Sequence, residues 1–372
     1  MSLRMCYKKR MNLYYVANRI SPKLYSEFGY IKDIVNEFTS RNQDSKDFEL
    51  MVFSPNVSSK KLQKEFEIDK NKIAKGRTPK IISSMIYRHL KKPLRIFDTG
   101  SIVHCFVDPS IKTSRVVKRI FEPVSAKRYI APHLFNEKTK LFTSIKDVSK
   151  CDIVIAHSQY MAEEISSKLF IDSDRIKIIP KAIEPKIDNS YEGTINLPNK
   201  YFLFAGRIEK YKNLERFIRA FSSWAPKDTN IVFAGDSINK GYFAKMNKFT
   251  SQILGEKAIF TGYICKQKLW KVMQNAIAVF DPSYINDFPD TIIESQALGT
   301  PVIASDIAQH KEICKNTVIY FDSLCENSIK QALDAVTDKK IHDSLVKKGK
   351  ANASLFTWDE VAPLYKDLYK SI

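Results

Sequence analysis

From residue 200 onward, short apolar segments alternate with longer segments whose apolar residues recur at helical spacing. The pattern predicts strands at Tyr201–Ala205, Asn230–Ala234, Ala258–Thr261, Ala276–Phe280, Pro301–Ala304 and Val318–Phe321. It predicts helices at Asn213–Ser222, Gly241–Leu254, Lys266–Gln274, Pro289–Leu298 and Gln309–Cys314. Strands that alternate with helices indicate a parallel sheet covered on both faces. Ligands of such sheets bind at the carboxyl ends of the strands.

The first half of the chain shows a similar alternation. Its expected strands are Asn12–Ala17, Phe48–Phe53, Ile102–Val107, Arg128–Ala131 and Asp152–Ala156, and its expected helices include Tyr25–Thr39, Ile81–Leu90 and Tyr160–Leu169. A segment rich in Pro, Asn and Gly then indicates a linker. We therefore predict an α/β chain with a first domain at 1–185, a linker at 186–199, a second domain at 200–355 and a final amphipathic helix at 356–372.

The composition agrees with two globular domains. The chain has 372 residues, of which 44% are hydrophobic and 12% aromatic, enough to form a core. No apolar run approaches the roughly 18–20 residues of a membrane helix. Asn12, Asn18 and Arg19 interrupt the apolar stretch near the amino terminus, so we expect no signal peptide. The six cysteines are scattered without metal-ligand spacing, which favours reduced thiols and a cytoplasmic location.

The net charge of +19 suggests an anionic partner, although a lysine-rich composition alone would give the same value. The segment Lys70–Phe97 contains nine Lys or Arg residues and no acidic residue. Its expected helix has an apolar stripe flanked by basic residues, so it either packs on the sheet or lies on an anionic membrane surface. No motif of nucleic-acid recognition accompanies the charge, and we expect no nucleic-acid partner.

Two segments carry the chemistry of the second domain. In the first, Gly206 ends a strand, and Arg207 and Lys212 follow it in the next loop and helix start. Cations are disfavoured at a helix amino terminus unless an anion is bound there. Two cations beside a glycine turn can hold a diphosphate. The alternative is a solvated, basic start of a helix.

The second segment, Asp287–Glu294, is a loop that leads into a helix. A helix amino terminus favours anions through its unpaired N–H groups. Glu294 lies one turn inside this helix, where its carboxylate can accept hydrogen bonds from ribose hydroxyls, although an ordinary first-turn glutamate would look the same. Together the two segments predict a site for a nucleotide diphosphate.

These motifs, in their order and spacing, resemble the family 4 glycosyltransferases, which are retaining enzymes of the GT-B fold (glycosyl transferases group 1). The resemblance is carried by Asp152–Met161, Ile178–Pro180, Gly206–Arg207 with Lys212–Asn213, and Asp287–Thr300. It implies two facing Rossmann-like domains, of which the second binds a nucleotide sugar and the first binds the acceptor. It also implies that the last helix crosses back onto the first domain and that neither a metal nor another cofactor is required.

The resemblance assigns roles to matched positions. It implies that Arg207 and Lys212, next to Gly206, contact the diphosphate, and that Glu294 binds the ribose. The remaining donor-binding residues in the second segment are Phe288, Pro289 and Asp290. Family members often have a histidine in the acceptor domain that touches the transferred sugar. His133 is the first choice for this role, and His104 is the second, with a core histidine as the alternative for His104.

The chain departs from the family pattern near the donor sugar. The family has a glutamate eight residues before the position of Glu294, followed by glycine, where this chain has Asn286 and Asp287. Asn286 can donate and accept hydrogen bonds to sugar hydroxyls. Asp287 either replaces the lost carboxylate or caps the loop. Both are included with Arg207, Lys212 and His133 among the predicted catalytic residues.

The sequence thus predicts a retaining glycosyltransferase that moves a hexose-type sugar from a nucleotide diphosphate to a lipid-linked or glycan acceptor. We expect it in the cytoplasm, peripherally attached to the inner face of the cell membrane. Two other functions stay open: a sugar-nucleotide epimerase of the same fold, and an inactive, transferase-like protein that binds the donor as a partner of another enzyme.

Overall fold

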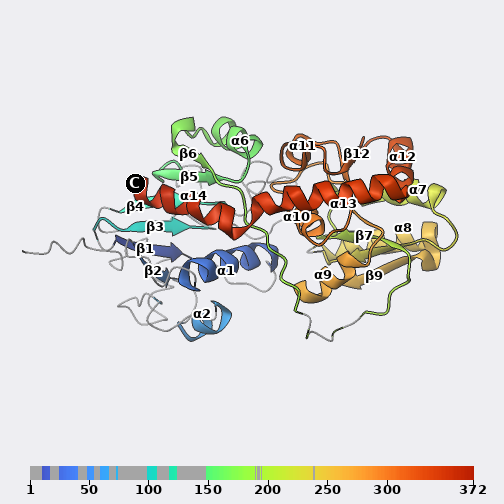
Figure 1. Cartoon of the computed structure of the whole chain (residues 1–372), viewed down its shortest axis with the longest axis horizontal. Coiled ribbons are helices and arrows are strands. Elements are labelled where there is room, and N and C mark those ends of the chain that lie inside the picture. Colours follow the sequence, from blue (N-terminus) through green and yellow to red (C-terminus); the bar gives the residue numbers. More distant parts are fainter. Residues whose placement is uncertain are drawn as a thin grey trace, which may run out of the picture.

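The protein forms two parallel six-stranded sheets that lie side by side along its longest axis (Figure 1). The computed structural model describes residues 11–16, 25–40, 48–53, 59–66, 73, 99–106, 117–123, 148–188, 190, 193, 195–237 and 239–372. The expected strand Arg128–Ala131, the expected helix Ile81–Leu90 and His133 lie outside the described residues. Among the described helices, none is both long enough and apolar enough to cross a membrane.

The first sheet has the strand order β2-β1-β3-β4-β5-β6. Its strands are β1 (Met11–Val16), β2 (Phe48–Phe53), β3 (Ile102–Cys105), β4 (Lys118–Phe121), β5 (Ile153–Ala156) and β6 (Ile176–Ile178). The helices described with it are α1 (Tyr25–Ser40), α2 (Ser59–Phe66) and α6 (Gln159–Leu169). The sequence pattern located β1, β2, β3 and β5 but predicted no strand at β4.

The second sheet has the order β12-β11-β10-β7-β8-β9. Its strands are β7 (Tyr201–Ala205), β8 (Asn230–Ala234), β9 (Ala258–Gly262), β10 (Ala278–Asp281), β11 (Val302–Ser305) and β12 (Ile319–Phe321). Its helices are α7 (Leu214–Trp224), α8 (Lys240–Leu254), α9 (Lys266–Gln274), α10 (Asp290–Ala297), α11 (Ala308–Cys314), α12 (Glu326–Thr337) and α13 (Lys339–Ala353). The predicted α/β class with two parallel sheets is confirmed.

The apolar strands of the second sheet are buried on both faces because successive side chains point to opposite sides. In β7, Phe202 and Phe204 enter one hydrophobic cluster, together with Phe217 of α7 and Phe280 of β10. The rings of Phe217 and Phe280 stack with their centroids 3.8 Å apart. The alternate β7 residue Leu203 enters a separate cluster on the other face. A continuous apolar strand is therefore what a doubly covered sheet requires.

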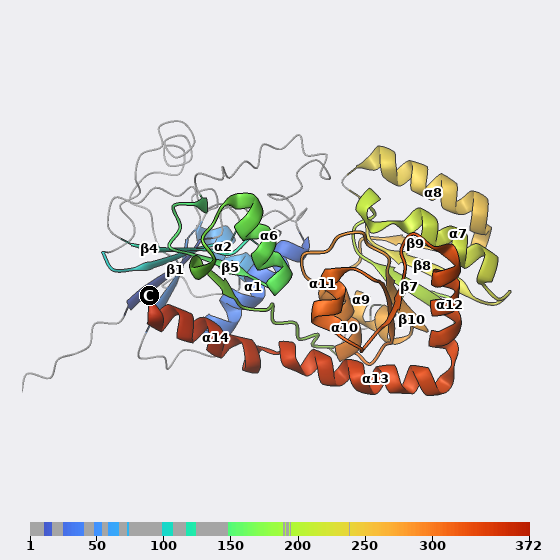
Figure 2. The same cartoon turned by 90° about the horizontal axis from the view of Figure 1, so that it is seen from above.

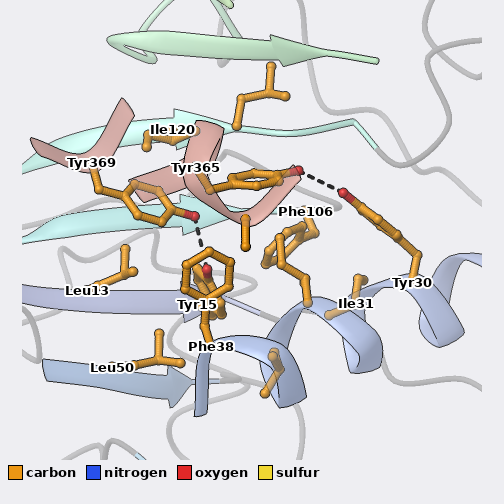
Figure 3. Packing of buried hydrophobic residues seen from close by; sticks show 14 of the residues in the cluster. Leu13, Tyr15, Tyr30, Ile31, Phe38, Leu50, Phe106, Ile120, Tyr365 and Tyr369 are labelled. Atoms are coloured by element: carbon orange, nitrogen blue, oxygen red, sulfur yellow. Dashed lines mark hydrogen bonds between the residues drawn. The ribbon is translucent and has the colours of Figure 1, made fainter. Parts of the chain in front are cut away.

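The last helix, α14 (Trp358–Ser371), leaves the second domain after α13 and returns to the first sheet, as predicted (Figures 1 and 2). Its buried face joins the core formed by β1, α1 and β3. Figure 3 shows two hydroxyl contacts inside this core: Tyr365 with Tyr30 at 2.7 Å and Tyr369 with Tyr15 at 3.0 Å. The helix is therefore fixed to the first domain by both apolar packing and hydrogen bonds.

The two domains also touch directly. Glu312 of α11 accepts hydrogen bonds from the backbone N–H groups of Gln159 at 2.6 Å and Tyr160 at 2.9 Å. These N–H groups belong to the first turn of α6, where a helix has unpaired donors and favours a negative charge. The second domain thus supplies an anion to a helix start of the first.

Candidate active site

The candidate site begins where β7 ends. Strands β7 and β10 pair in parallel, so their carboxyl ends lie at the same edge of the sheet. Gly206 follows β7 with φ 146°, and its N–H donates to the carbonyl of Ala234 at 3.0 Å. A Cβ atom on the neighbouring Gly235 would lie 1.8 Å from the carbonyl oxygen of Gly206. The two backbones approach so closely that only glycine fits at position 235.

The two predicted diphosphate cations lie in the turn that follows. Arg207 is half-buried, and Lys212 ends a short 3₁₀ turn, Lys210–Lys212, just before α7. The Nζ atom of Lys212 lies 3.5 Å from Oδ2 of Asp281, the last residue of β10. Only 13% of the Lys212 side chain is exposed. A buried carboxylate therefore sets the position of this cation.

The loop after β10 lies against the turn after β7. The backbone N–H of Tyr284 donates to the carbonyl of Tyr211 at 2.9 Å. The hydroxyl of Tyr284 donates to Oδ1 of Asn213 at 2.6 Å. The structure thus brings the segment of Arg207 and Lys212 together with the segment that contains Asn286 and Asp287.

Asp281 is the centre of a buried polar cluster that sequence reasoning missed. Its Oδ1 atom accepts hydrogen bonds from the backbone N–H of Ser283, at 3.1 Å, and from the hydroxyl of the same residue. Its Oδ2 atom lies 3.1 Å from Nδ2 of Asn286 and 3.7 Å from Nε2 of His310. Burial alone would raise the pKa of Asp281, but the charges of Lys212 and His310 and the hydrogen bonds from Ser283 outweigh it and hold the pKa below its usual range.

The predicted ribose ligand, Glu294, lies on α10. Its Oε1 atom is 3.7 Å from Nζ of Lys266 at the start of α9, and Lys266 also lies 3.7 Å from Oδ2 of Asp33 on α1. Burial raises the pKa of Glu294, and the positive charge of Lys266 counteracts that rise. A lysine therefore links the predicted ribose ligand to the first domain.

The donor loop also faces the first domain. The ring of Phe288 is buried, with its centroid 6.3 Å from the ring of His157. Pro289 precedes α10, and Asp290 begins it. The Oδ2 atom of Asp290 lies 3.3 Å from Nζ of Lys181, a buried lysine that follows β6. The segment predicted to approach the donor sugar is thus positioned by contacts from both domains.

The described histidine of the predicted pair, His104, belongs to the core. It is fully buried on β3, with Nε2 2.9 Å from Oε2 of Glu122 and Nδ1 2.9 Å from the hydroxyl of Tyr369. Its ring stacks on Phe106 at 4.4 Å. This environment favours the core interpretation of His104. A contact with the transferred sugar by His133 stays a prediction.

Comparison with known structures defines the fold class. The protein HepE of Anabaena, solved in complex with UDP and glucose, superposes with a TM-score of 0.71 at 13% sequence identity. The match covers 98% of this chain and all of HepE. The chain therefore has the GT-B architecture, with two Rossmann-like domains.

Residues 186–352, which include the residues of the second domain described above, match the family model of the glycosyl transferases group 1. An uncharacterized glycosyltransferase of Methanocaldococcus jannaschii is 27% identical over 256 residues, 64% of this chain and 65% of its own length. A relative in Campylobacter jejuni, N-acetylgalactosamine-N,N'-diacetylbacillosaminyl-diphospho-undecaprenol 4-alpha-N-acetylgalactosaminyltransferase, is 24% identical over 238 residues, 61% of this chain and 62% of its own length. The chain spans less than two thirds of both relatives. The resemblance to group 1 is confirmed, and membership of the retaining family 4 stays a prediction.

Proposed function

We propose that the protein is a retaining glycosyltransferase that moves a sugar from a nucleotide diphosphate to a lipid-linked or glycan acceptor. One observation carries the proposal: Arg207 and Lys212 stand at the carboxyl edge of the second sheet, beside the loop of the group 1 domain that leads to Glu294. Two cations and a helix start at one edge form a site suited to a diphosphate.

The chemistry follows from where charge develops. When the bond between sugar and diphosphate breaks, negative charge grows on the leaving phosphate oxygens. The planar guanidinium of Arg207 can bind two of these oxygens at once, and the ammonium of Lys212 acts as a point charge. Both stabilise the transition state more than the ground state. Because this pair supplies the positive charge, we propose transfer without a metal, and a chelator should leave turnover unchanged.

The known relatives support the choice of substrates. HepE was solved with UDP and glucose, which supports a nucleotide sugar as donor. The name of the Campylobacter jejuni relative describes a diphospho-undecaprenol acceptor, which supports a lipid-linked acceptor for this chain. The relatives from Methanocaldococcus jannaschii and Campylobacter jejuni are both named as glycosyltransferases, which favours transfer over the epimerase alternative.

A thermal-shift screen against nucleotide sugars tests this proposal. The matching donor should raise the melting temperature, because a ligand bound only to the folded state stabilises it. The same donor should have a much smaller effect on a protein carrying both Arg207→Ala and Lys212→Ala. No stabilisation of the wild-type protein by any nucleotide sugar or nucleoside diphosphate would contradict the proposal.

One observation favours a second function, that of a protein that binds the donor without turning it over. The amide of Asn286 lies at hydrogen-bond distance from Asp281 and His310, where the family resemblance places a carboxylate. Tight donor binding with no transfer to any lipid-linked or glycan acceptor would support this function. Product formed without an acceptor would instead support an epimerase.

We also propose that the protein acts in the cytoplasm at the inner face of the membrane. The basic segment Lys70–Phe97 lies outside the described residues, apart from the buried Ile73. Its lysines and arginines should attract anionic lipid, with an affinity that falls sharply as salt increases. Sedimentation with liposomes that contain acidic lipid, compared with neutral liposomes, tests this part of the proposal.

A further inference from the structure

The buried cluster at the end of β10 has four members from four segments. Lys212 comes from the turn after β7, Asp281 from the end of β10, Asn286 from the loop that follows it, and His310 from α11. Lys212 Nζ, Asn286 Nδ2 and His310 Nε2 all lie within 3.7 Å of the same oxygen, Asp281 Oδ2. Asp281 and His310 are both buried.

The hydrogen bonds fix which atoms carry protons. His310 Nδ1 lies 3.0 Å from the carbonyl oxygen of Ser305, so this nitrogen bears the proton and donates. In the neutral ring, Nε2 is then an acceptor, and it lies 3.2 Å from Nδ2 of Asn286. The same amide nitrogen faces Asp281 at 3.1 Å. The amide oxygen could not take this place, because it would face a carboxylate oxygen and repel it.

The amide at position 286 therefore donates a hydrogen bond to Asp281 in either state of His310, and it donates a second one to Nε2 when the ring of His310 is neutral. A primary amide can do this, but an ionised carboxylate cannot. A glutamate at this position would place a second negative charge beside Asp281, and two close carboxylates cannot both stay ionised at little cost. The amide at 286 and the carboxylate at 281 are thus mutually compatible, whereas two carboxylates are not.

We propose that Asp281 is the positioning carboxylate of the donor site: it holds the ammonium of Lys212 in place, and Asn286 is uncharged because the negative charge of this region stands at position 281. This inference rests on the proposed function. Asp281 acts through Lys212 and is not itself placed in contact with the diphosphate.

Loss of the Asp281 charge should affect turnover more than binding. The Lys212 ammonium would keep its charge and could still attract a diphosphate, so affinity should hold or increase. The ammonium would, however, lose the Asp281 carboxylate that fixes its orientation, and stabilisation of the transition state depends on that orientation. We expect Asp281→Asn to lower kcat by about 10- to 100-fold, with nucleoside diphosphate affinity within about threefold of wild type.

The test is a double-mutant cycle of wild type, Asp281→Asn, Asn286→Glu and the variant with both changes. Asn286→Glu alone should lower both kcat and the melting temperature, because it adds a carboxylate beside Asp281. The double variant moves the charge from 281 to 286, and its kcat should exceed that of either single variant by about tenfold. Asp228→Asn is the matched control, because Asp228 forms an exposed pair with Lys200 at 2.6 Å and should change nothing.

The readouts are kcat, the calorimetric affinity for UDP, GDP and ADP, and the melting temperature. Unchanged kcat in Asp281→Asn, or strictly additive effects in the cycle, would overturn the inference while leaving the proposed function intact. Wild-type protein that neither binds a nucleoside diphosphate nor transfers sugar would instead overturn the proposed function. Even in that case, the melting temperatures test whether carboxylates at positions 281 and 286 are incompatible. Asn286→Glu should then be less stable than the double variant, and the opposite order would refute this incompatibility.

Discussion

Replacing Tyr365 with phenylalanine should weaken the attachment of α14 to the first domain. The Tyr365 hydroxyl is buried 2.8 Å from Oε1 of Glu122 and 2.7 Å from the hydroxyl of Tyr30, which itself donates to the same Oε1 at 2.7 Å. Burial would raise the pKa of Glu122, but hydrogen bonding and the charge of His104, with further contributions from His157 and Tyr30, lower it. The Tyr365 hydroxyl therefore donates to an ionised acceptor.

The free energy of unfolding lost in Tyr365→Phe follows from the charge on Glu122. A hydrogen bond to a charged group contributes about 1.5–3 kcal/mol, against about 0.5–1.5 kcal/mol for a neutral pair. Tyr201→Phe is the matched control, because its buried hydroxyl donates to the neutral carbonyl of Val272 at 2.7 Å. With about 2–4 °C per kcal/mol for a domain of this size, Tyr365→Phe should lower the melting temperature of the first domain by roughly 3–12 °C.

The assay is urea unfolding followed by the fluorescence of Trp358, the first residue of α14. The other tryptophans, Trp224 and Trp270, are replaced by phenylalanine so that the signal reports this helix. Tyr201→Phe lies in the second domain and is followed in a companion protein that keeps only Trp224, whose ring is 5.5 Å from that of Phe202. The expected result is a larger loss of unfolding free energy for Tyr365→Phe than for Tyr201→Phe. Equal losses would mean that Glu122 is not an ionised acceptor holding the helix.

Three further predictions concern the site and its surroundings. Arg207→Ala and Lys212→Ala should each lower kcat/KM by roughly 10- to 150-fold, since each removes a charge-assisted hydrogen bond of about 1.5–3 kcal/mol. Equal turnover in the wild type and both variants would show that Arg207 and Lys212 do not bind the diphosphate. Glu294→Gln should reduce the calorimetric affinity for the nucleoside diphosphate, because the charge-assisted bonds to ribose are lost, and an unchanged affinity would show that Glu294 does not face the ribose. Burial lowers the pKa of His157, so the unfolded chain takes up a proton near pH 6.5, at a higher pH than the folded protein does. The stability difference between wild type and His157→Gln should therefore decrease as pH falls through that value, and a difference that stays constant between about pH 8 and 5 would contradict the lowered pKa.

The second sheet could be predicted closely from the sequence because each of its strands is a continuous apolar run. The expected strand Asn230–Ala234 and the expected helix Lys266–Gln274 coincide with β8 and α9. Burial on both faces produces that signal. In the first sheet, β4 has only four residues and begins with Lys118 and Arg119, so its sequence lacks the apolar character that marks the other strands.

The site was predicted in part because its two cations, Arg207 and Lys212, are close together in the sequence. The carboxylate that contacts Lys212, Asp281, could not be found in the same way. Asp281 follows a strand expected to end at Phe280, and the structure extends that strand by one residue to include it. His310 reaches Asp281 only because β10 and β11 are neighbours in the sheet, which sequence spacing does not reveal. A carboxylate directly after an apolar strand was the available signal.

The histidines illustrate a different limit. The sequence offered a core position for His104 as an alternative to a catalytic one, and the burial of its partner Glu122 favours the core position. The spacing of residues along the sequence did not indicate that Glu122 would contact His104, Tyr30 and Tyr365 of α14. Such contacts between distant segments depend on the tertiary fold.

Nuclear magnetic resonance of the transfer product tests the central claim most directly. The protein is incubated with the nucleotide sugar that stabilises it and with a lipid-linked or glycan acceptor, and the anomeric configuration of the new bond is compared with that of the donor. The account predicts a glycosylated acceptor with the donor configuration retained, and strongly reduced product when Arg207 and Lys212 are both alanine. An inverted product, or equal product from the wild-type and doubly substituted proteins, would contradict it.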